Sequence, residues 1–416
     1  MHTRKRTPRT PTPTKTTVTA RASPRPKRRS RRSRRRLAGG KAIASGANGC
    51  VFDPAIKCMN QASESKGKIS KLSWTKDSNA EWAKLVEIRN AISGYPDLEK
   101  YFILAYKEPC KPDFIHDDYT DYDKICTISL QSDTSILQST NGGPTLFGLG
   151  TTRTTAPTLL FIPFLNAMIE LLRNGIVPLN NLGVVHRDIK PDNVVCSTTS
   201  GKYEIRLIDW DRAANIRDSH DEISTREQFF TIMFNQPIAY AFNSARTKKI
   251  IRTNANLELA DNLEKEVKNN QQVVFVDNAA RYATGGGFNA ADSLVRPQIT
   301  AILKKFYNAR TKMFNWNEYA ELLTRNYDVY GWLGVINFCM QQRRTIFSDE
   351  GTYAYYVEPM KAFLTEYMYA PEVLVEPYNT EEMITRLNAI RLSVSEPTAL
   401  PTCPAHEVRR SDQTFK

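Results

Sequence analysis

Residues 186–193 read His-Arg-Asp-Ile-Lys-Pro-Asp-Asn, and this octapeptide constrains the chain more than any other segment. It brings a carboxylate (Asp188), an ammonium group (Lys190) and an amide (Asn193) into one short loop. Phosphoryl transfer needs these groups, because a carboxylate orients the attacking hydroxyl, a cation stabilises the migrating phosphoryl group and a neutral oxygen binds Mg²⁺. The alternative is a polar surface loop that matches by accident, and the length of the match disfavours it. The segment therefore predicts phosphoryl-transfer chemistry.

A predicted strand follows the octapeptide. Residues 203–208 alternate in polarity and carry branched side chains, which is typical of a β-strand. They run directly into Asp209-Trp210-Asp211. In the family that both motifs resemble, this strand places the three residues next to the octapeptide, which implies that the Trp210 ring lies in the core.

Both motifs resemble the protein kinase superfamily, the first its catalytic loop and the second its metal-binding loop. The resemblance implies a bilobal α+β fold, with a β-rich N-lobe at about residues 42–140 and a helical C-lobe at about residues 141–395. It also implies a protein kinase that uses ATP and Mg²⁺ and phosphorylates protein substrates. Lys190 follows the serine/threonine pattern.

The site residues that the resemblance implies are Asp188, Lys190, Asn193 and Asp209, of which Asn193 and Asp209 are the metal ligands. Asp211 departs from the pattern, which has glycine at this position. An aspartate there restricts the backbone flip that glycine allows.

Residues 44–51, Ala-Ser-Gly-Ala-Asn-Gly-Cys-Val, resemble the glycine-rich loop that covers the ATP phosphates. Glycine lets backbone N–H groups approach phosphate closely. Gly46 and Gly49 match the second and third glycines of the pattern, Ala44 replaces the first, and Val51 should pack on adenine. The alternative is an ordinary hairpin turn.

Two lysines are candidates for binding the α- and β-phosphates. Lys57 lies only six residues after Val51, which is too short for a strand to end, turn and return alongside itself. Lys71 leaves room for a hairpin with a polar turn at residues 63–67. We therefore prefer Lys71, and the alternative for either lysine is a solvated side chain.

A helix predicted at residues 79–93 and capped by Asp77 or Ser78 should present a glutamate to that lysine. Its apolar residues at helical spacing should be buried. They are Trp82, Leu85, Ile88 and Ile92. Glu81 and Glu87 are both candidates for the ion pair, and the sequence does not decide between them.

Further elements are expected around this centre. Strands are predicted at residues 101–105 and 135–138, and a long helix from Pro157 to Leu182 should lead into the catalytic loop. Asp328-Val329-Tyr330 resembles the start of the buried kinase helix whose aspartate supports the catalytic-loop backbone. A plain apolar helix is the alternative.

The interval between Asp209 and Asp328 is longer than a standard activation segment. Residues 229–242 are interpreted as the substrate-facing end of that segment, and residues 243–325 as an insertion. Gly-Cys-Val-Phe at residue 49, Ile-Ser-Lys-Leu at residue 69 and Phe-Asn-Gln-Pro at residue 234 resemble kinases of large nucleocytoplasmic DNA viruses. That likeness covers residues 42–395 and is compatible with a location in the host cytoplasm, the nucleus or the virion.

Residues 1–36 hold 15 Lys and Arg residues and no Asp or Glu. These residues carry a charge of +15, whereas the whole chain has a net charge of +13, so the charges of the remaining residues sum to −2. With few apolar side chains, residues 1–38 are predicted to be a disordered tail, and residues 396–416 a C-terminal tail. The basic tail suits nucleic acid, an acidic partner or a nuclear-import receptor, and a solvated tail is the alternative.

The seven cysteines are scattered without short paired spacings, so we expect neither a zinc site nor a disulfide framework. Buried thiols in an intracellular, reducing compartment are the simplest interpretation. The sequence has no apolar run long enough to span a membrane and no secretory signal at its start. It does not indicate an oligomeric state.

Two rival functions remain. One is a kinase-fold enzyme that acts on a small molecule or lipid, because the segment that would hold a peptide is poorly matched. The other is a non-catalytic scaffold tethered to nucleic acid through the tail. The joint presence of Asp188, Asn193 and Asp209 argues against the scaffold.

Overall fold

The computed structural model describes residues 41–46, 49–59, 67–113, 122–128, 133–151, 159–199, 202–225, 245–253, 259–269, 290–348 and 354–392. The chain divides into Met1–Ala38 and Gly39–Lys416, and every described residue belongs to the second unit. The predicted tails at 1–38 and 396–416 and the segment 229–242 therefore lie outside the described residues. The described part is a mixed α+β fold with small antiparallel sheets, which confirms the predicted class.

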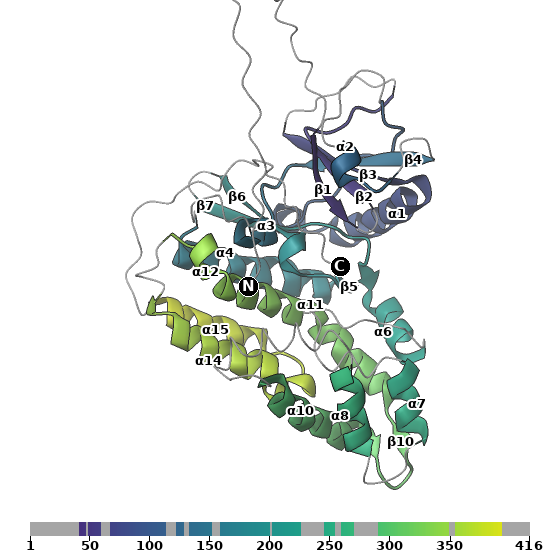
Figure 1. Ribbon diagram of the computed structural model, residues 1–416, viewed down its shortest axis with the longest axis vertical. Coiled ribbons are helices and arrows are strands. Elements are labelled where there is room, and N and C mark those ends of the chain that lie inside the picture. The colour runs from purple at the N-terminus through teal and green to yellow at the C-terminus, as the bar shows by residue number, and fades with distance from the viewer. Residues whose placement is uncertain are drawn as a thin grey trace, which may run out of the picture. The chain divides into compact units, whose positions relative to one another are not determined.

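A four-stranded antiparallel sheet opens the described chain (Figure 1). Its strands, in order across the sheet, are β1 (Lys41–Gly46), β2 (Gly49–Asp53), β3 (Lys68–Trp74) and β4 (Thr134–Thr140). The register aligns Ala44, Val51, Lys71 and Leu137 in one cross-strand row. Neighbouring residues of a strand point to opposite faces. The adjacent row, Cys50, Leu72 and Ile136, therefore belongs to the other face, where it forms a small apolar core.

Helix α1 (Thr75–Ile92) follows β3 directly and packs against β3 and β4. Of the four residues predicted to be buried, Leu85, Ile88 and Ile92 are buried, whereas Trp82 is half-buried against the same core. The predicted start was wrong: Trp74 occupies the N-cap and makes no side-chain cap hydrogen bond. Ser78 is buried instead, with its hydroxyl 2.5 Å from that of Ser73.

Two cysteine pairs tie the outer face of the sheet to the segment that precedes β4. Cys50 pairs with Cys126, beside the short helix α2 (Tyr122–Ile125), and Cys58 pairs with Cys110, with Cα–Cα distances of 5.6 Å in both cases. The expectation of no disulfides was therefore wrong. The partners are 76 and 52 residues apart, so only the folded sheet brings them together. Cys196 and Cys339 are buried thiols, as expected.

The predicted strand at residues 101–105 was also wrong. The chain forms a 3₁₀ turn, η1 (Pro96–Tyr101), and then passes beside another strand, β7 (Lys202–Leu207). Phe102 forms a single bridge with Leu207, and the amide of Ile103 donates to the Leu207 carbonyl at 2.9 Å. These contacts connect the first part of the chain to the strand that precedes Asp209.

The predicted helix 157–182 is present as three successive segments, α4 (Phe161–Leu171), a π-helical turn η2 (Leu172–Ile176) and α5 (Val177–Asn181). Pro157 lies outside the described residues. The elements around the octapeptide are α3 (Leu146–Thr151), β5 (Val184–Val185), η3 (Pro191–Asn193), β6 (Val194–Thr199), β7, β8 (Ala214–Asn215) and α6 (Ile216–Thr225).

The rest of the described chain is mainly helical. It comprises α7 (Ala245–Thr253), α8 (Leu259–Asn269), α10 (Ala290–Phe306), β9 (Tyr307–Asn308), β10 (Met313–Phe314), α11 (Trp316–Gln341), α12 (Arg343–Ile346), α14 (Val357–Leu364), η5 (Thr365–Tyr369), η6 (Pro371–Leu374) and α15 (Thr380–Leu392). Residues of the predicted insertion build an apolar core of their own with the start of α11. Helix α11 begins at Trp316, so it continues from the predicted insertion through Asp328 without a break. None of the described helices is both long and apolar enough to cross a membrane.

Candidate active site

Lys71 is the centre of an ionic cluster. Its ammonium nitrogen lies 2.9 Å from a carboxylate oxygen of Glu81 and 2.7 Å from one of Asp209. Strand β3 supplies the lysine, α1 the glutamate and the loop after β7 the aspartate. Of the two glutamate candidates, Glu81 is buried beside Lys71, whereas Glu87 is exposed on α1.

The charges in this cluster are unequal, because two carboxylates contact one ammonium group. Burial raises the pKa of Glu81; Lys71 opposes this effect, and the charges of Asp209 and Asp211 add to it. Burial would also raise the pKa of Asp209, but Lys71, His186 and Lys190 together hold it below its usual value. Burial lowers the pKa of Lys71, and its two carboxylate partners more than reverse this effect. Lys71 therefore stays protonated between two carboxylates.

The octapeptide forms a second polar cluster. The Lys190 ammonium donates to Oδ2 of Asp188 at 2.7 Å, and the Asn193 amide nitrogen donates to the same oxygen and to the Asp188 carbonyl, both at 2.9 Å. Asp188 and Asn193 are buried. Because its amide nitrogen is used within the loop, Asn193 has its amide oxygen for a ligand.

The register of a two-stranded hairpin connects the two clusters. Strand β6 pairs with β7 so that Val194 lies opposite Leu207, and the Ile208 amide donates to the Asn193 carbonyl at 3.0 Å. Asn193 and Asp209 are therefore held at the same end of the hairpin. These are the two residues that were predicted to bind metal.

Trp210 is buried, as predicted, and fixes the loop that carries Asp209. Its ring lies 4.5 Å from the His186 ring and 5.1 Å from the Phe102 ring, centroid to centroid. The indole N–H donates to the Ile103 carbonyl at 3.2 Å. Asp209 itself has φ 65°, a left-handed backbone conformation that residues other than glycine rarely adopt.

Asp328 holds the octapeptide through two hydrogen bonds to its backbone and makes a third to Asn180. Its fully buried carboxylate accepts from the backbone amides of His186 at 2.8 Å and Arg187 at 2.9 Å, and from the Asn180 side chain at 2.9 Å. Gly331, one turn later on α11, lies so close to the octapeptide that an added Cβ would meet the Ile189 carbonyl oxygen at 2.7 Å. The sequence indicated Asp328 by resemblance, whereas Asn180 and Gly331 were missed.

The glycine-rich segment has the expected hairpin, in which Gly46 pairs with Gly49. The residues between them lie outside the described part. A Cβ at Gly49 would meet the Leu72 carbonyl oxygen at 2.6 Å, so packing on β3 alone requires glycine there. Ala44 and Val51 share the cross-strand row of Lys71. Lys57 is outside the sheet, and its backbone carbonyl accepts from the amide of Asp113.

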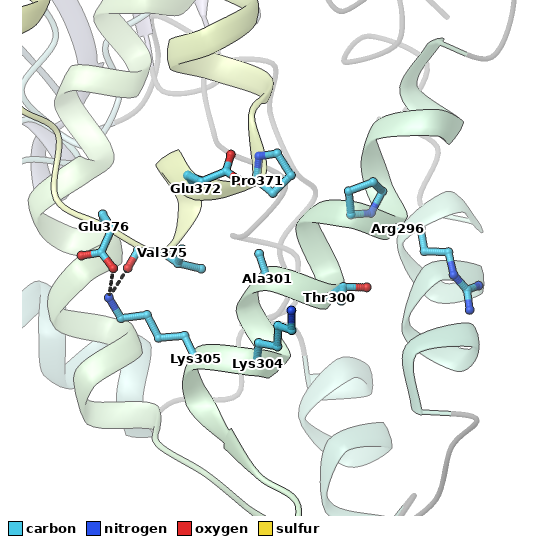
Figure 2. Close-up of a pocket in the computed structure, with 10 residues that line it drawn as sticks. Arg296, Thr300, Ala301, Lys304, Lys305, Pro371, Glu372, Val375 and Glu376 are labelled. Atoms are coloured by element: carbon cyan, nitrogen blue, oxygen red, sulfur yellow. Dashed lines mark hydrogen bonds and ion pairs between the residues drawn. The ribbon is translucent and has the colours of Figure 1, made fainter.

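A separate groove of about 720 Å³ lies between α10 and η6 (Figure 2). Two of the three basic side chains that line it are already paired. Lys305 contacts Glu376 at 2.6 Å, and Arg296 contacts Asp261 and Glu264 at 2.6 and 2.7 Å. The groove shares no residue with the Lys71 cluster.

No protein-family model matches this chain, and no curated protein matches it significantly. Within the described ranges, no group of three or more His, Cys, Asp or Glu side chains is arranged to bind a metal ion.

Proposed function

We propose that this chain is a Mg²⁺- and ATP-dependent serine/threonine protein kinase with a bilobal fold. The observation that carries the proposal is the Lys71 ammonium held between Glu81 and Asp209. The hairpin β6–β7 links this cluster to the loop that contains Asp188 and Asn193. A phosphate-binding cation, a metal-binding carboxylate and a hydroxyl-orienting carboxylate thus occur in one site.

The residues fit Mg²⁺, which prefers carboxylate and amide oxygens. Asp209 and Asn193 would hold the ion. The lowered pKa of Asp209 keeps its carboxylate ionised, and Asn193 offers its amide oxygen. When bound, Mg²⁺ neutralises charge on the ATP phosphates.

In the proposed reaction, a substrate hydroxyl oxygen bonds to the γ-phosphorus while the bond to the β–γ bridging oxygen breaks and ADP leaves. Asp188 orients the hydroxyl and accepts its proton. Lys190 donates to the γ-phosphoryl oxygens, and Lys71 exchanges its contact with Asp209 for the α- and β-phosphates. Positioning and charge stabilisation provide most of the catalysis in this class of reaction.

The test is transfer of labelled γ-phosphate from Mg-ATP to a mixed protein panel by the full chain. Asp188→Asn should reduce the rate by about 10²–10⁴-fold while ATP still binds, because the general base is lost. Asp209→Ala should remove the Mg²⁺-dependent activity. An unchanged rate in Asp188→Asn would contradict the mechanism. Transfer to small alcohols alone would favour a small-molecule kinase, and failure to bind ATP would favour a scaffold.

A further inference from the structure

Helix α1 contacts the Asp209-Trp210-Asp211 loop at two positions on one face. Glu81 is linked to the loop indirectly, because it contacts Lys71, which in turn contacts Asp209. Lys84, one turn further along, donates from its ammonium group to the main-chain carbonyl of Asp211. Helix residues three apart project from the same side, so one rigid element holds both ends of the loop.

The backbone of this loop has an unfavourable conformation, so contacts from outside the loop are needed to hold it. Asp209 is in the left-handed region, and Asp211 lacks the conformational freedom of glycine. Trp210 is anchored in the core through its ring and its indole N–H. The carbonyl of Asp211 lies just after this anchor, where Lys84 fixes the direction of the chain.

We infer that Lys84 is a positioning residue for metal binding, an inference that rests on the proposed kinase function. By tying the Asp211 carbonyl to α1, Lys84 keeps the Asp209 carboxylate beside Lys71 and next to Asn193. The same tie couples two functions, since a displacement of α1 would move both the partner of the nucleotide-binding lysine and the metal-binding loop. Lys84 acts through the backbone and does not touch the substrate.

The test compares Lys84→Met with Lys84→Arg and with Lys76→Met in the full chain, using labelled phosphate transfer across a Mg²⁺ titration. Lys76 is an exposed residue of the same helix and serves as the matched control. We expect Lys84→Met to raise the Mg²⁺ concentration for half-maximal transfer about tenfold, because a charge-assisted hydrogen bond is lost. Lys84→Arg should restore it to within about threefold, and Lys76→Met should leave it unchanged. A lower melting temperature and maximal rate with an unchanged Mg²⁺ requirement would overturn the inference.

A second measurement does not depend on phosphate transfer. The amides of Ile208 and Ala213 donate to the carbonyls of Asn193 and Trp210, so they report on the loop. Their hydrogen exchange should be faster in Lys84→Met and unchanged in Lys76→Met. If the wild type transfers phosphate to no acceptor, the proposed function fails, whereas exchange still shows whether Lys84 holds the loop. Equal exchange in the wild type and Lys84→Met would reject the inference.

Discussion

The sheet with α1 and the helical region hold their candidate catalytic groups by different means. In the helical region, the loop of Asp188 rests on the buried carboxylate of Asp328, which binds the backbone itself. In the sheet region, Lys71 is fixed by two charged side chains, and the opposite face of the sheet is tied by two cysteine pairs. The first arrangement is rigid at the backbone, and the second depends on side-chain charge and covalent links.

This difference predicts two kinds of mutational effect. Changes at Asp328, which supports the loop of Asp188, should act on stability, because buried amide groups lose their hydrogen-bond acceptor. Changes around Lys71 should act on nucleotide binding, because its partner Asp209 is partly exposed and a ligand can replace that contact. The following experiments test this separation.

The largest expected effect is that of Asp328→Ala. It removes the acceptor of two backbone amides and of the Asn180 side chain from a fully buried position, and these unsatisfied donors should lower the free energy of unfolding by about 3–5 kcal/mol. Urea denaturation measures the change. Asp328→Asn keeps one acceptor oxygen and should lose less. A denaturation midpoint like that of the wild type would contradict this account of the loop.

Reduction of the cysteine pairs should weaken the sheet region selectively. Each link closes a long loop, and removal of such a link typically costs about 2–4 kcal/mol. Hydrogen exchange with and without reductant should show faster exchange in β1–β4 and little change in α11. Equal acceleration in both regions would show that they unfold together and would break the comparison.

Lys71→Met should lower ATP affinity about 10–100-fold, since one charge-assisted interaction with phosphate is lost. Lys57→Met is the matched control, because Lys57 lies outside the cross-strand row of Lys71 and should leave the affinity unchanged. Titration with a fluorescent ATP analogue measures both variants. A larger effect of Lys57→Met would assign the phosphates to the other lysine.

Gly331→Ala should displace the catalytic loop, because its new Cβ would lie 2.7 Å from the Ile189 carbonyl oxygen. We expect a loss of about 1–3 kcal/mol in stability and a lower kcat with a smaller change in KM. Gly94→Ala is the control, because nothing lies within 4 Å of its Cβ position. Equal stability of the two variants would mean that α11 has room to shift.

The smallest effect concerns Glu81. Because the pKa of Glu81 is raised and that of Asp209 is lowered, a fall in pH protonates Glu81 first. As the pH falls, ATP affinity should therefore weaken through protonation of Glu81 while the Asp209 carboxylate is still charged. Glu81→Gln should reduce affinity about 3–10-fold at neutral pH, as expected for a single partly screened ion pair, and flatten this pH dependence. Glu87→Gln should behave as the wild type; a flattened acid dependence in Glu87→Gln would reassign the titrating group to Glu87.

The local parts of the site could be predicted from the sequence. A short motif fixes the order of Asp188, Lys190 and Asn193, and the alternation of β7 predicts that Asp209 follows a strand. The choice between Glu81 and Glu87 was not accessible, because the two lie about 120° apart around a helix and only the packing of α1 selects one. The Glu81–Lys84 spacing was visible, but nothing in the sequence showed that the Asp211 carbonyl would face α1.

The predictions for the cysteines and for residues 101–105 were wrong for a common reason. Each depends on contacts between positions far apart in the chain, which periodicity does not encode. Apolar, branched residues at 101–105 suit a strand, yet the backbone forms only one bridge beside β7. The start of α1 at Thr75 likewise follows from its direct continuation of β3.

Ala44, Val51, Lys71 and Leu137 share one face of the sheet because side chains alternate between the two faces along each strand. The facing of Lys71 therefore depends on the number of residues that precede it in β3. Insertion of one residue between Lys68 and Lys71 would turn the ammonium group toward the face of Cys50 and Ile136, an apolar setting in which a charge is strongly disfavoured. Insertion of two residues would return the Lys71 side chain to its original face of the sheet. Length variation in this protein is therefore expected to fall between the strands, while β3 itself keeps its length to within an even number of residues.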